Sequence, residues 1–423
     1  MPLHRFPPRT ARPCLSWLVA SVWLTAMASA HGIVFAAPPS ATETIANRLV
    51  KTLNGVEAEG VGHAAAMELM SESLQATPVT TPQLFATLNS MAEANPRAKN
   101  WLRLLASQQI ELADSKAKTG STERSFDADL LTFFNDRTHD GDARYLVYRH
   151  LIDRDPERLE TLLEQAVDDP FIPLRYLAIQ RKLKLADDLE GENAIEAYLE
   201  LLPLARHPDH LRDITGSLKK LDRPVQLAKQ LAMIMRWHVI APFDNQDSEG
   251  FDQVTDVETQ YVDSPLDVEL LDQSFAAKPS SGNDPTPADE MLDWQPLATD
   301  DNAGMVDLNP TYNNAKEAIA YAVCYFELPE DETTDAQARL GSINANKVWV
   351  NGEPVLSNEV YHSGSSIDQY VSNCRLHPGL NSVLLKICQN NQTDPWAQDW
   401  HFQFRLTDST GRGIPVTVVN AAR

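Results

Sequence analysis

A polar segment near the C-terminus has the residue types that bind sugars. It runs from Asn390 to Asp399 as Asn-Asn-Gln-Thr-Asp-Pro-Trp-Ala-Gln-Asp, between two stretches of strand-forming residues. Amide and carboxylate groups pair with hydroxyls, while an aromatic face packs against a pyranose ring. The segment predicts a ligand site built from Asn390, Asn391, Gln392, Trp396 and Asp399. The alternative is that Trp396 packs inside the loop or the core and contacts no ligand.

A second candidate is an acidic segment, Asp244-Asn-Gln-Asp-Ser-Glu249. Clustered carboxylate oxygens are the ligands that calcium prefers. Asp244, Asp247 and Glu249 therefore form a candidate structural calcium site, although their spacing differs from that of an EF-hand. The alternative is an acidic loop that is solvated and holds no ion. No other cofactor is predicted.

Motifs that would identify an enzyme are absent from the sequence. There is no Gly-x-Ser-x-Gly, phosphate-binding Gly-x-x-x-x-Gly-Lys or His-Glu-x-x-His, and the segment 362–366 is typical of a hairpin loop. Acidic residues are too numerous for any two to be chosen as the carboxylate pair of a glycosidase. We therefore predict no catalytic residue and favour a non-catalytic protein, while enzymatic activity stays open.

The net charge of the chain limits the partners we expect, and its length limits the number of domains. The chain has 423 residues, with 36 Lys or Arg against 59 Asp or Glu, and a formal net charge of −23. Such a charge disfavours binding to nucleic acid, whose phosphates repel it. A chain of this length forms about two or three domains.

The first 30 residues are typical of a secretory signal peptide. Arg5, Arg9 and Arg12 precede an apolar run at 15–27, and Ala28-Ser-Ala30 follows as a small-residue cleavage site. Cleavage could also fall as late as residue 37. The apolar run is shorter than the roughly 20 residues that span a bilayer, although a retained N-terminal anchor is the alternative. We expect an exported protein, periplasmic or associated with the cell envelope, with no membrane span after the signal is removed.

Three cysteines follow the leader, Cys324, Cys374 and Cys388, all in strand-like segments. An oxidising compartment would permit one disulfide among them. Buried free thiols are the equally weighted alternative.

Residues 38–235 have the apolar spacing of helices, as in Leu159, Leu162, Leu163 and Ala166. We divide this part into a helical region at 38–125 and repeats at 126–235. Within the repeats an acid precedes an arginine near three helix starts. These arginines, Arg144, Arg175 and Arg212, are 31 and 37 residues apart, close to the length of a two-helix repeat.

The segment Asp169-Pro-Phe-Ile-Pro-Leu-Arg-Tyr-Leu-Ala178 resembles the second helix of HEAT-type repeats. The resemblance extends over about 126–220. It implies an α-solenoid in which an acid and an arginine link neighbouring units, with a long surface for protein contact. An irregular helical bundle is the alternative.

Strand signals dominate the C-terminal part, residues 236–423. Acidic loops are expected at 244–310, joined by short strands. Lys347-Val-Trp-Val350 leads into Asn351-Gly352, a strong hairpin signal. Further strands are expected at 320–328, 383–388 and 400–406, so the pattern favours an all-β sandwich.

The order of Lys347-Val-Trp-Val-Asn-Gly352, Val360-Tyr-His362 and Leu376-His-Pro-Gly-Leu-Asn381 resembles galactose-binding-like domains. These are the jelly-roll accessory sandwiches of family 2 glycoside hydrolases and of some sialic-acid esterases, and the resemblance covers about 236–410. It implies either sugar binding through loops at one end of the sandwich or a bracing role beside a neighbouring domain.

Together these features predict a multidomain α + β protein with an all-α helical-repeat part and an all-β jelly-roll sandwich. The leading hypothesis is an exported, non-catalytic binding or scaffold protein, with a protein partner on the repeats and a polysaccharide on the sandwich. One alternative is a carbohydrate-processing enzyme, a glycosidase or esterase, whose active site has no recognisable motif. The other is a structural envelope component without a small ligand.

Overall fold

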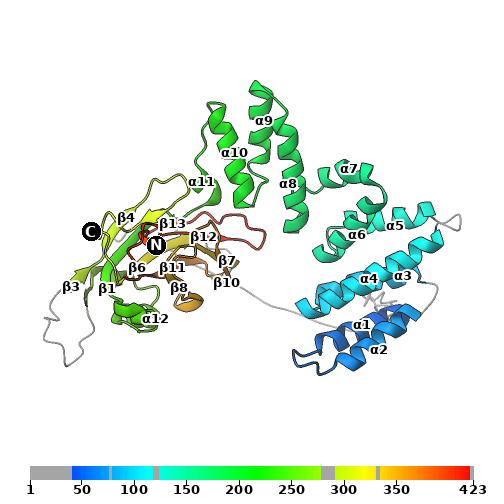
Figure 1. Ribbon diagram of the computed structural model, residues 1–423, viewed down its shortest axis with the longest axis horizontal. Coiled ribbons are helices and arrows are strands. Elements are labelled where there is room, and N and C mark those ends of the chain that lie inside the picture. The colour runs from blue at the N-terminus through cyan, green and yellow to red at the C-terminus, as the bar shows by residue number, and fades with distance from the viewer. Residues whose placement is uncertain (1–40, 76–78, 118–122, 278–290, 330–333, 420–423) are drawn as a thin grey trace, which may run out of the picture.

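A computed structural model describes residues 41–75, 79–117, 123–277, 291–329 and 334–419. A helical part is followed by a sandwich of antiparallel sheets (Figure 1), which confirms the multidomain α + β class. The predicted signal peptide lies outside the described residues. Within the described residues, none of the helices is both long enough and apolar enough to cross a bilayer.

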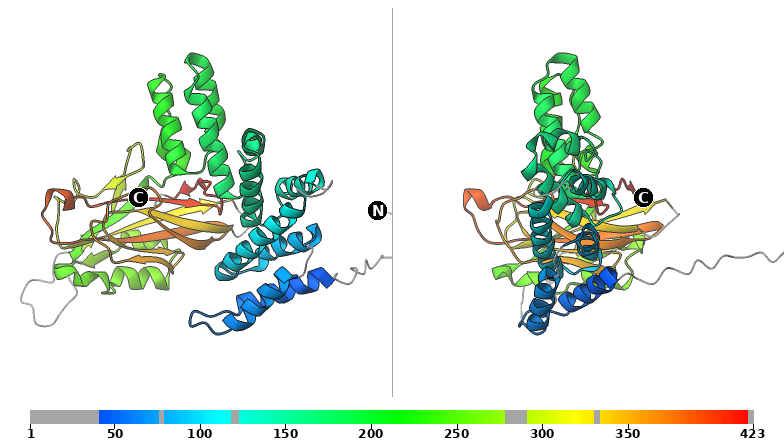
Figure 2. Two further views of the ribbon diagram at one scale, coloured as in Figure 1. Left: turned by 45° about the vertical axis from the view of Figure 1, so that its right-hand side comes forward. Right: turned by 90° about the vertical axis from the view of Figure 1, so that its right-hand side faces the viewer.

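The helices of the first part pack side by side, and the later ones stand beside the sandwich (Figures 1 and 2). Polar caps begin several of them; Thr80 and Gln83, for example, form a reciprocal capping box at one start. The helices are α1 (Ala41–Asn54), α2 (His63–Gln75), α3 (Thr81–Asn89), α4 (Pro96–Ala117), α5 (Glu123–Asn135), α6 (Gly141–Arg154), α7 (Leu159–Glu164), α8 (Ile172–Asp187), α9 (Gly191–Leu201), α10 (Pro208–Lys220) and α11 (Leu227–Leu231).

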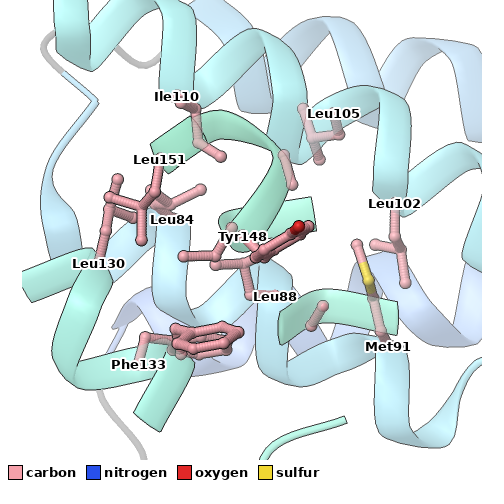
Figure 3. Packing of buried hydrophobic residues seen from close by; sticks show 14 of the residues in the cluster. Leu84, Leu88, Met91, Leu102, Leu105, Ile110, Leu130, Phe133, Tyr148 and Leu151 are labelled. Atoms are coloured by element: carbon pink, nitrogen blue, oxygen red, sulfur yellow. The ribbon is translucent and has the colours of Figure 1, made fainter. Parts of the chain in front are cut away.

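Two apolar clusters hold this helical part together. The first extends from α1 to the start of α8, and Figure 3 shows Leu88, Leu105 and Tyr148 meeting at its centre. The second begins at Ile179 in α8 and ends at Met233. Ala303 and Ile367, which lie later in the chain, pack against it. The second cluster therefore joins the helices to the sandwich.

A buried ion pair joins α6 to the turn that precedes α8. Arg144 of α6 donates from Nη1 and Nη2 to the two carboxylate oxygens of Asp169, at 3.0 and 2.6 Å. The side chains are only 2% and 1% exposed. Arg144 Nε also donates to the Phe134 carbonyl, and Arg175 Nε donates to the Asp169 carbonyl. Asp169 and Arg144, both singled out in the sequence, thus pair between the α7–α8 turn and α6.

The sandwich has a seven-stranded sheet in the order β4-β1-β6-β11-β8-β9, with β13 also on β6, facing a four-stranded sheet in the order β10-β7-β12-β5. The strands are β1 (Arg236–Asp244), β4 (Gln295–Ala298), β5 (Val306–Asp307), β6 (Ala318–Leu328), β7 (Thr334–Gly341), β8 (Ala345–Val350), β9 (Glu353–Asn358), β10 (Tyr370–Leu376), β11 (Gly379–Gln389), β12 (His401–Thr407) and β13 (Thr417–Val418). β2 (Ser274–Ala276) and β3 (Met291–Asp293) form a separate pair.

The large sheet is buried on both faces. Val348 and Val350 face the core between the sheets, whereas Trp349 faces the other side, as strand alternation predicts. On that outer face lies helix α12 (Asp256–Asp263), in a region for which the sequence predicted only short strands and loops. Thr255 caps this helix by accepting the Glu258 N–H. The Thr-x-x-Glu spacing is a local signal for this helix start, which the sequence prediction missed.

Helix α12 is anchored to the sheet by a buried polar cluster. Lys386 Nζ donates to Glu258 Oε1 at 2.8 Å and to the Gln253 carbonyl at 2.8 Å. The Tyr321 hydroxyl donates to the same Glu258 oxygen at 2.5 Å. Because each charged group has partners, the lysine and the carboxylate are accommodated in the interior.

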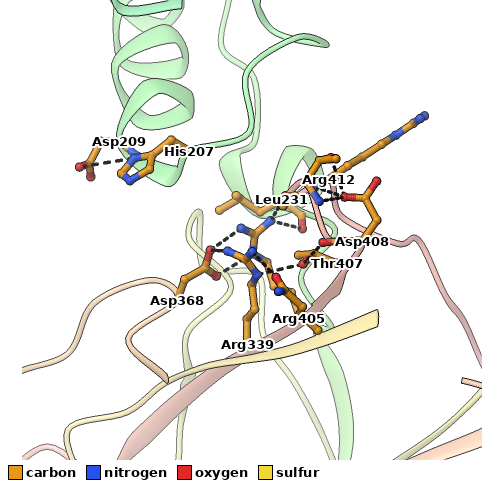
Figure 4. A network of polar contacts seen from close by, with 12 residues as sticks. His207, Asp209, Leu231, Arg339, Asp368, Arg405, Thr407, Asp408 and Arg412 are labelled. Carbon is orange, nitrogen blue, oxygen red and sulfur yellow. Dashed lines mark hydrogen bonds and ion pairs between the residues drawn. The ribbon is translucent and has the colours of Figure 1, made fainter. Parts of the chain in front are cut away.

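A polar network fastens the sandwich to the helices (Figure 4). Arg405 of β12 donates to Asp368 through Nε at 2.8 Å and also through Nη2, while Arg339 Nη1 donates to Asp368 at 2.7 Å. Arg405 is 1% exposed, and its Nη1 also reaches the Leu231 carbonyl at the end of α11. Just beyond α11, the Ile234 N–H donates to the Phe404 carbonyl at 3.0 Å. The two parts are therefore joined by ion pairs, backbone hydrogen bonds and apolar packing.

Candidate functional site

Five connecting segments meet at one end of the sandwich, which we call the loop end. Strand register places them there: Asp244 of β1 and Gln389 of β11 both pair with Ala318, the first residue of β6. Asn346 at the start of β8 likewise pairs with Asn358 at the end of β9. The loop end comprises segments 244–251, 308–317, 342–344, 359–369 and 390–400.

Backbone hydrogen bonds tie these segments to one another. The Asn245 N–H donates to the Glu317 carbonyl at 2.8 Å, and the Glu317 N–H donates to the Asn390 carbonyl at 3.1 Å. The His362 N–H donates to the Ile343 carbonyl at 2.7 Å. The loop end is thus a hydrogen-bonded assembly rather than a set of independent loops.

A buried amide cluster supports the 390–400 segment from beneath. Asn344 Nδ2 donates to Gln389 Oε1 at 3.2 Å and to the Asp399 carbonyl at 3.1 Å. Gln389 Nε2 donates to the same Asp399 carbonyl at 3.2 Å, and its Oε1 accepts the Asn390 N–H. Because Asn344 and Gln389 are fully buried, these contacts fix the backbone on both sides of Trp396.

Trp396 projects from this supported segment into solvent. It lies on the short 3₁₀ helix η5 (Pro395–Ala397) and is 59% exposed. The next residue, Ala397, is buried, and its carbonyl accepts the Lys316 Nζ at 2.9 Å. The indole meets the His362 ring edge to face at 5.5 Å and 86°. Trp396 therefore belongs to the loop surface, as the ligand-site interpretation requires, and not to the core.

The predicted binding residues divide into supporting and exposed groups. Asn390 is 8% exposed; its Oδ1 contacts His362 Nε2 at 2.9 Å and accepts the Gln392 N–H at 3.1 Å. Because Asn390 Oδ1 accepts in both contacts, His362 Nε2–H is the donor to it. Asn391 and the Asp399 side chain are exposed on the same segment as Trp396.

Sequence reasoning missed His362 and Lys316 as members of this site. His362 has φ of +58° within the 359–369 segment, and its proximity to Trp396 depends on how β9 pairs with β8. Lys316 approaches because β6 lies beside β11. Neither contact leaves a local signal in the sequence, since both come from sheet register.

The acidic segment predicted to bind calcium also lies at the loop end. Asp244 Oδ1 accepts the Gln246 N–H at 3.1 Å, and the Asp247 N–H donates to Glu317 Oε1 at 3.2 Å. Over the described ranges, no three His, Cys, Asp or Glu side chains gather closely enough to hold a metal ion. The calcium site at Asp244, Asp247 and Glu249 therefore stays a prediction.

The helical part contains a separate groove of about 520 Å³ between α4, α6 and the start of α8. Arg103 Nη2 donates to Asp142 Oδ1 at 2.8 Å, and the Tyr145 and Phe171 rings meet at 6.3 Å with a tilt of 51°. Groups of both charges and two aromatic rings therefore line the groove. Its lining includes Arg103, Glu111, Asp142, Tyr145, Arg149 and Phe171.

The three described cysteines are free thiols. Burial raises the pKa of Cys324 and of Cys388 to about 12, so both remain protonated at neutral pH. Of the two sequence alternatives, the structure thus has the free thiols.

No known family matches the sequence, and no curated protein matches it either. One solved structure that is similar is a crystal structure of selenomethionine-labelled beta-glucosidase from Kluyveromyces marxianus. Its TM-score is 0.22 and its identity 11%, over 78% of this chain and 36% of that chain. This chain spans about a third of the beta-glucosidase it matches, and a similarity at this level supports no argument about fold or function.

Proposed function

We propose that this protein is an exported, non-catalytic binding protein that holds a polysaccharide at the loop end and a protein partner on its helices. The observation that carries the proposal is Trp396, a large aromatic side chain that is 59% exposed on a segment fixed from beneath. Exposed aromatic rings beside polar groups are typical of sugar platforms.

The support beneath Trp396 favours binding rather than mere exposure. The Asn344, Gln389 and Asn390 amides hold the backbone, and His362 contacts the indole edge. A ligand therefore meets a site whose side chains need little ordering, which reduces the entropic cost of binding. The Asn391 and Gln392 amides, on the same segment as the indole, supply donors and acceptors for hydroxyl groups.

Two further features support the interpretation of the helical part as HEAT-type repeats and of the sandwich as a galactose-binding-like domain. The Arg144–Asp169 pair links neighbouring helices in the way that HEAT-type repeats imply, and strands closing on shared end loops suit a galactose-binding-like jelly roll. The groove with Tyr145 and Phe171 is the surface we assign to the protein partner, because aromatic rings and arginine are enriched at interface centres.

Substituting Trp396→Ala should strongly weaken polysaccharide binding without unfolding the protein. We expect affinity to fall at least about 30-fold, the loss typical of a central aromatic contact. Calorimetric titration of the full-length protein against soluble polysaccharides measures this, since removing a tryptophan would distort a fluorescence signal. Trp396→Phe, which retains a smaller ring, is the matched variant and should lose less. Equal affinity in Trp396→Ala, or no binding by wild type to any polysaccharide tested, would contradict the proposal.

The groove assignment is tested with Arg149→Glu, which reverses one exposed charge that lines the groove. We expect the amount of an envelope protein retained on immobilised full-length protein to fall about tenfold. A loss of this size is typical when a charged group at an interface loses its oppositely charged counterpart. Arg223→Glu, exposed near the C-terminal end of α10 and outside the groove, is the control and should retain the partner. Equal retention by both variants would exclude the groove from the interface.

The alternative of a carbohydrate-processing enzyme is decided on the same polysaccharides. Release of reducing ends or acetate by purified protein would favour a glycosidase or an esterase. Binding without any product would favour the non-catalytic function.

A further inference from the structure

Carboxylates greatly outnumber lysine and arginine side chains at the loop end, where Trp396 lies. The five segments of the loop end, all of them described, hold one lysine or arginine, Lys316, whose Nζ is bonded to the Ala397 carbonyl. Asp368 is paired with arginines, which leaves seven carboxylates with some exposure: Asp244, Asp247, Glu249, Glu317, Glu359, Asp394 and Asp399.

Two of these acids lie on the same segment as the indole. Asp394 precedes Trp396 by two residues and Asp399 follows it by three, and both side chains are exposed. Salt screens charges over about 8 Å at physiological ionic strength, so acids on the same loop still act on a ligand at the ring. The field of the loop end therefore attracts cations and repels anions.

From this charge distribution we infer that the glycan bound at Trp396 carries protonated amino groups, as a glucosamine polymer does. The inference rests on the proposed function and names the class of glycan. An ammonium group beside the indole face gains a cation–π attraction in addition to the carboxylate field. A glycan with uronic acids meets repulsion from the same groups, whereas a neutral glycan gains only stacking and hydrogen bonds.

Three oligosaccharides of equal length separate these contributions: an oligomer of glucosamine, its N-acetylated form and an oligomer of galacturonic acid. Each is titrated into the full-length protein by calorimetry, at a pH where the amine is protonated and the carboxylates are ionised. At low salt we expect the amine form to bind about tenfold more tightly than the acetylated form, because several exposed charge pairs, each weak alone, act together. Physiological salt should reduce the difference in affinity between the amine and acetylated forms. The uronate oligomer should bind most weakly.

Paired variants locate the effect. Asp394→Asn with Asp399→Asn removes two charges beside the indole, and neither carboxylate makes a hydrogen bond that supports the segment. We expect the preference for the amine form over the acetylated form to fall about threefold. The matched control, Glu327→Gln with Glu353→Gln, removes two exposed charges at the opposite end of the sheet and should leave the preference intact.

The outcomes distinguish this inference from the proposed function. If the uronate oligomer binds as tightly as the amine form, the charge inference is overturned while glycan binding stands. A preference that survives the paired Asp394 and Asp399 substitutions also overturns it. If none of the three binds and longer polysaccharides also fail, the proposed function itself fails.

Discussion

Asp368→Asn should lower the free energy of unfolding by about 3–5 kcal/mol, the cost of breaking a buried ion pair by removing one partner. Asp368 is the common acceptor of Arg405 and Arg339, and Arg405 is buried beneath the end of α11. Asparagine keeps the shape but leaves Arg405 uncompensated. Urea denaturation followed by tryptophan fluorescence measures the change.

The control for this substitution is Asp335→Asn. Asp335 pairs with Arg375 at 3.4 Å, but their side chains are 89% and 68% exposed, so this pair contributes little. We expect the control to unfold at nearly the wild-type urea concentration. A loss below about 1 kcal/mol in Asp368→Asn would show that water, not Asp368, satisfies the buried arginine.

The same carboxylate gives stability a dependence on pH. Burial alone would raise the pKa of Asp368, but Arg405 and Arg339 outweigh burial and hold the pKa below its ordinary value. The contribution is therefore complete above the unfolded pKa of about 3.9 and is lost as pH falls through the lower, folded pKa. Acidification should narrow the stability difference between wild type and Asp368→Asn.

Asp169→Asn should cost about the same, about 3–5 kcal/mol, in the helical part. It leaves the buried Arg144 charge without its carboxylate and replaces the oxygen that accepts Arg144 Nη2–H with an NH2 group, which cannot accept. Thermal unfolding followed by helical circular dichroism reports on this part of the chain.

Asp209→Asn is the corresponding control, because the Asp209–Arg212 pair is exposed and lies within one helix. It should change stability by less than about 1 kcal/mol. If both aspartates proved equally dispensable, the Arg144–Asp169 pair would not be the link between neighbouring helices.

Local signals predicted much of this fold. Arg144 and Arg175 stand near helix starts at repeat-like spacing, and Asn351-Gly352 joins β8 to β9 where a hairpin was expected. Such features depend on residues close in the chain. The exposed position of Trp396 also agrees with its flanking polar residues.

The contacts that the sequence did not predict depend on strand register and on residues far apart in the chain. His362 lies beside Trp396, and Asp368 lies beneath Arg405, because strands pair in a particular order. Nothing near these residues in the chain specifies those neighbours. Helix α12 is a different case, since its capping signal, Thr255-x-x-Glu258, is local and lies within an acidic, loop-like composition.

The junction between helices and sandwich has a mechanical consequence. Arg405, Asp368 and the Ile234 backbone join the two parts at the same place where Met233 and Ile367 complete an apolar cluster. A rotation about this point would break ion pairs and expose apolar surface at the same time, so we expect the junction to be rigid and not to act as a hinge. A force applied at the loop end would therefore be transmitted to the helical part.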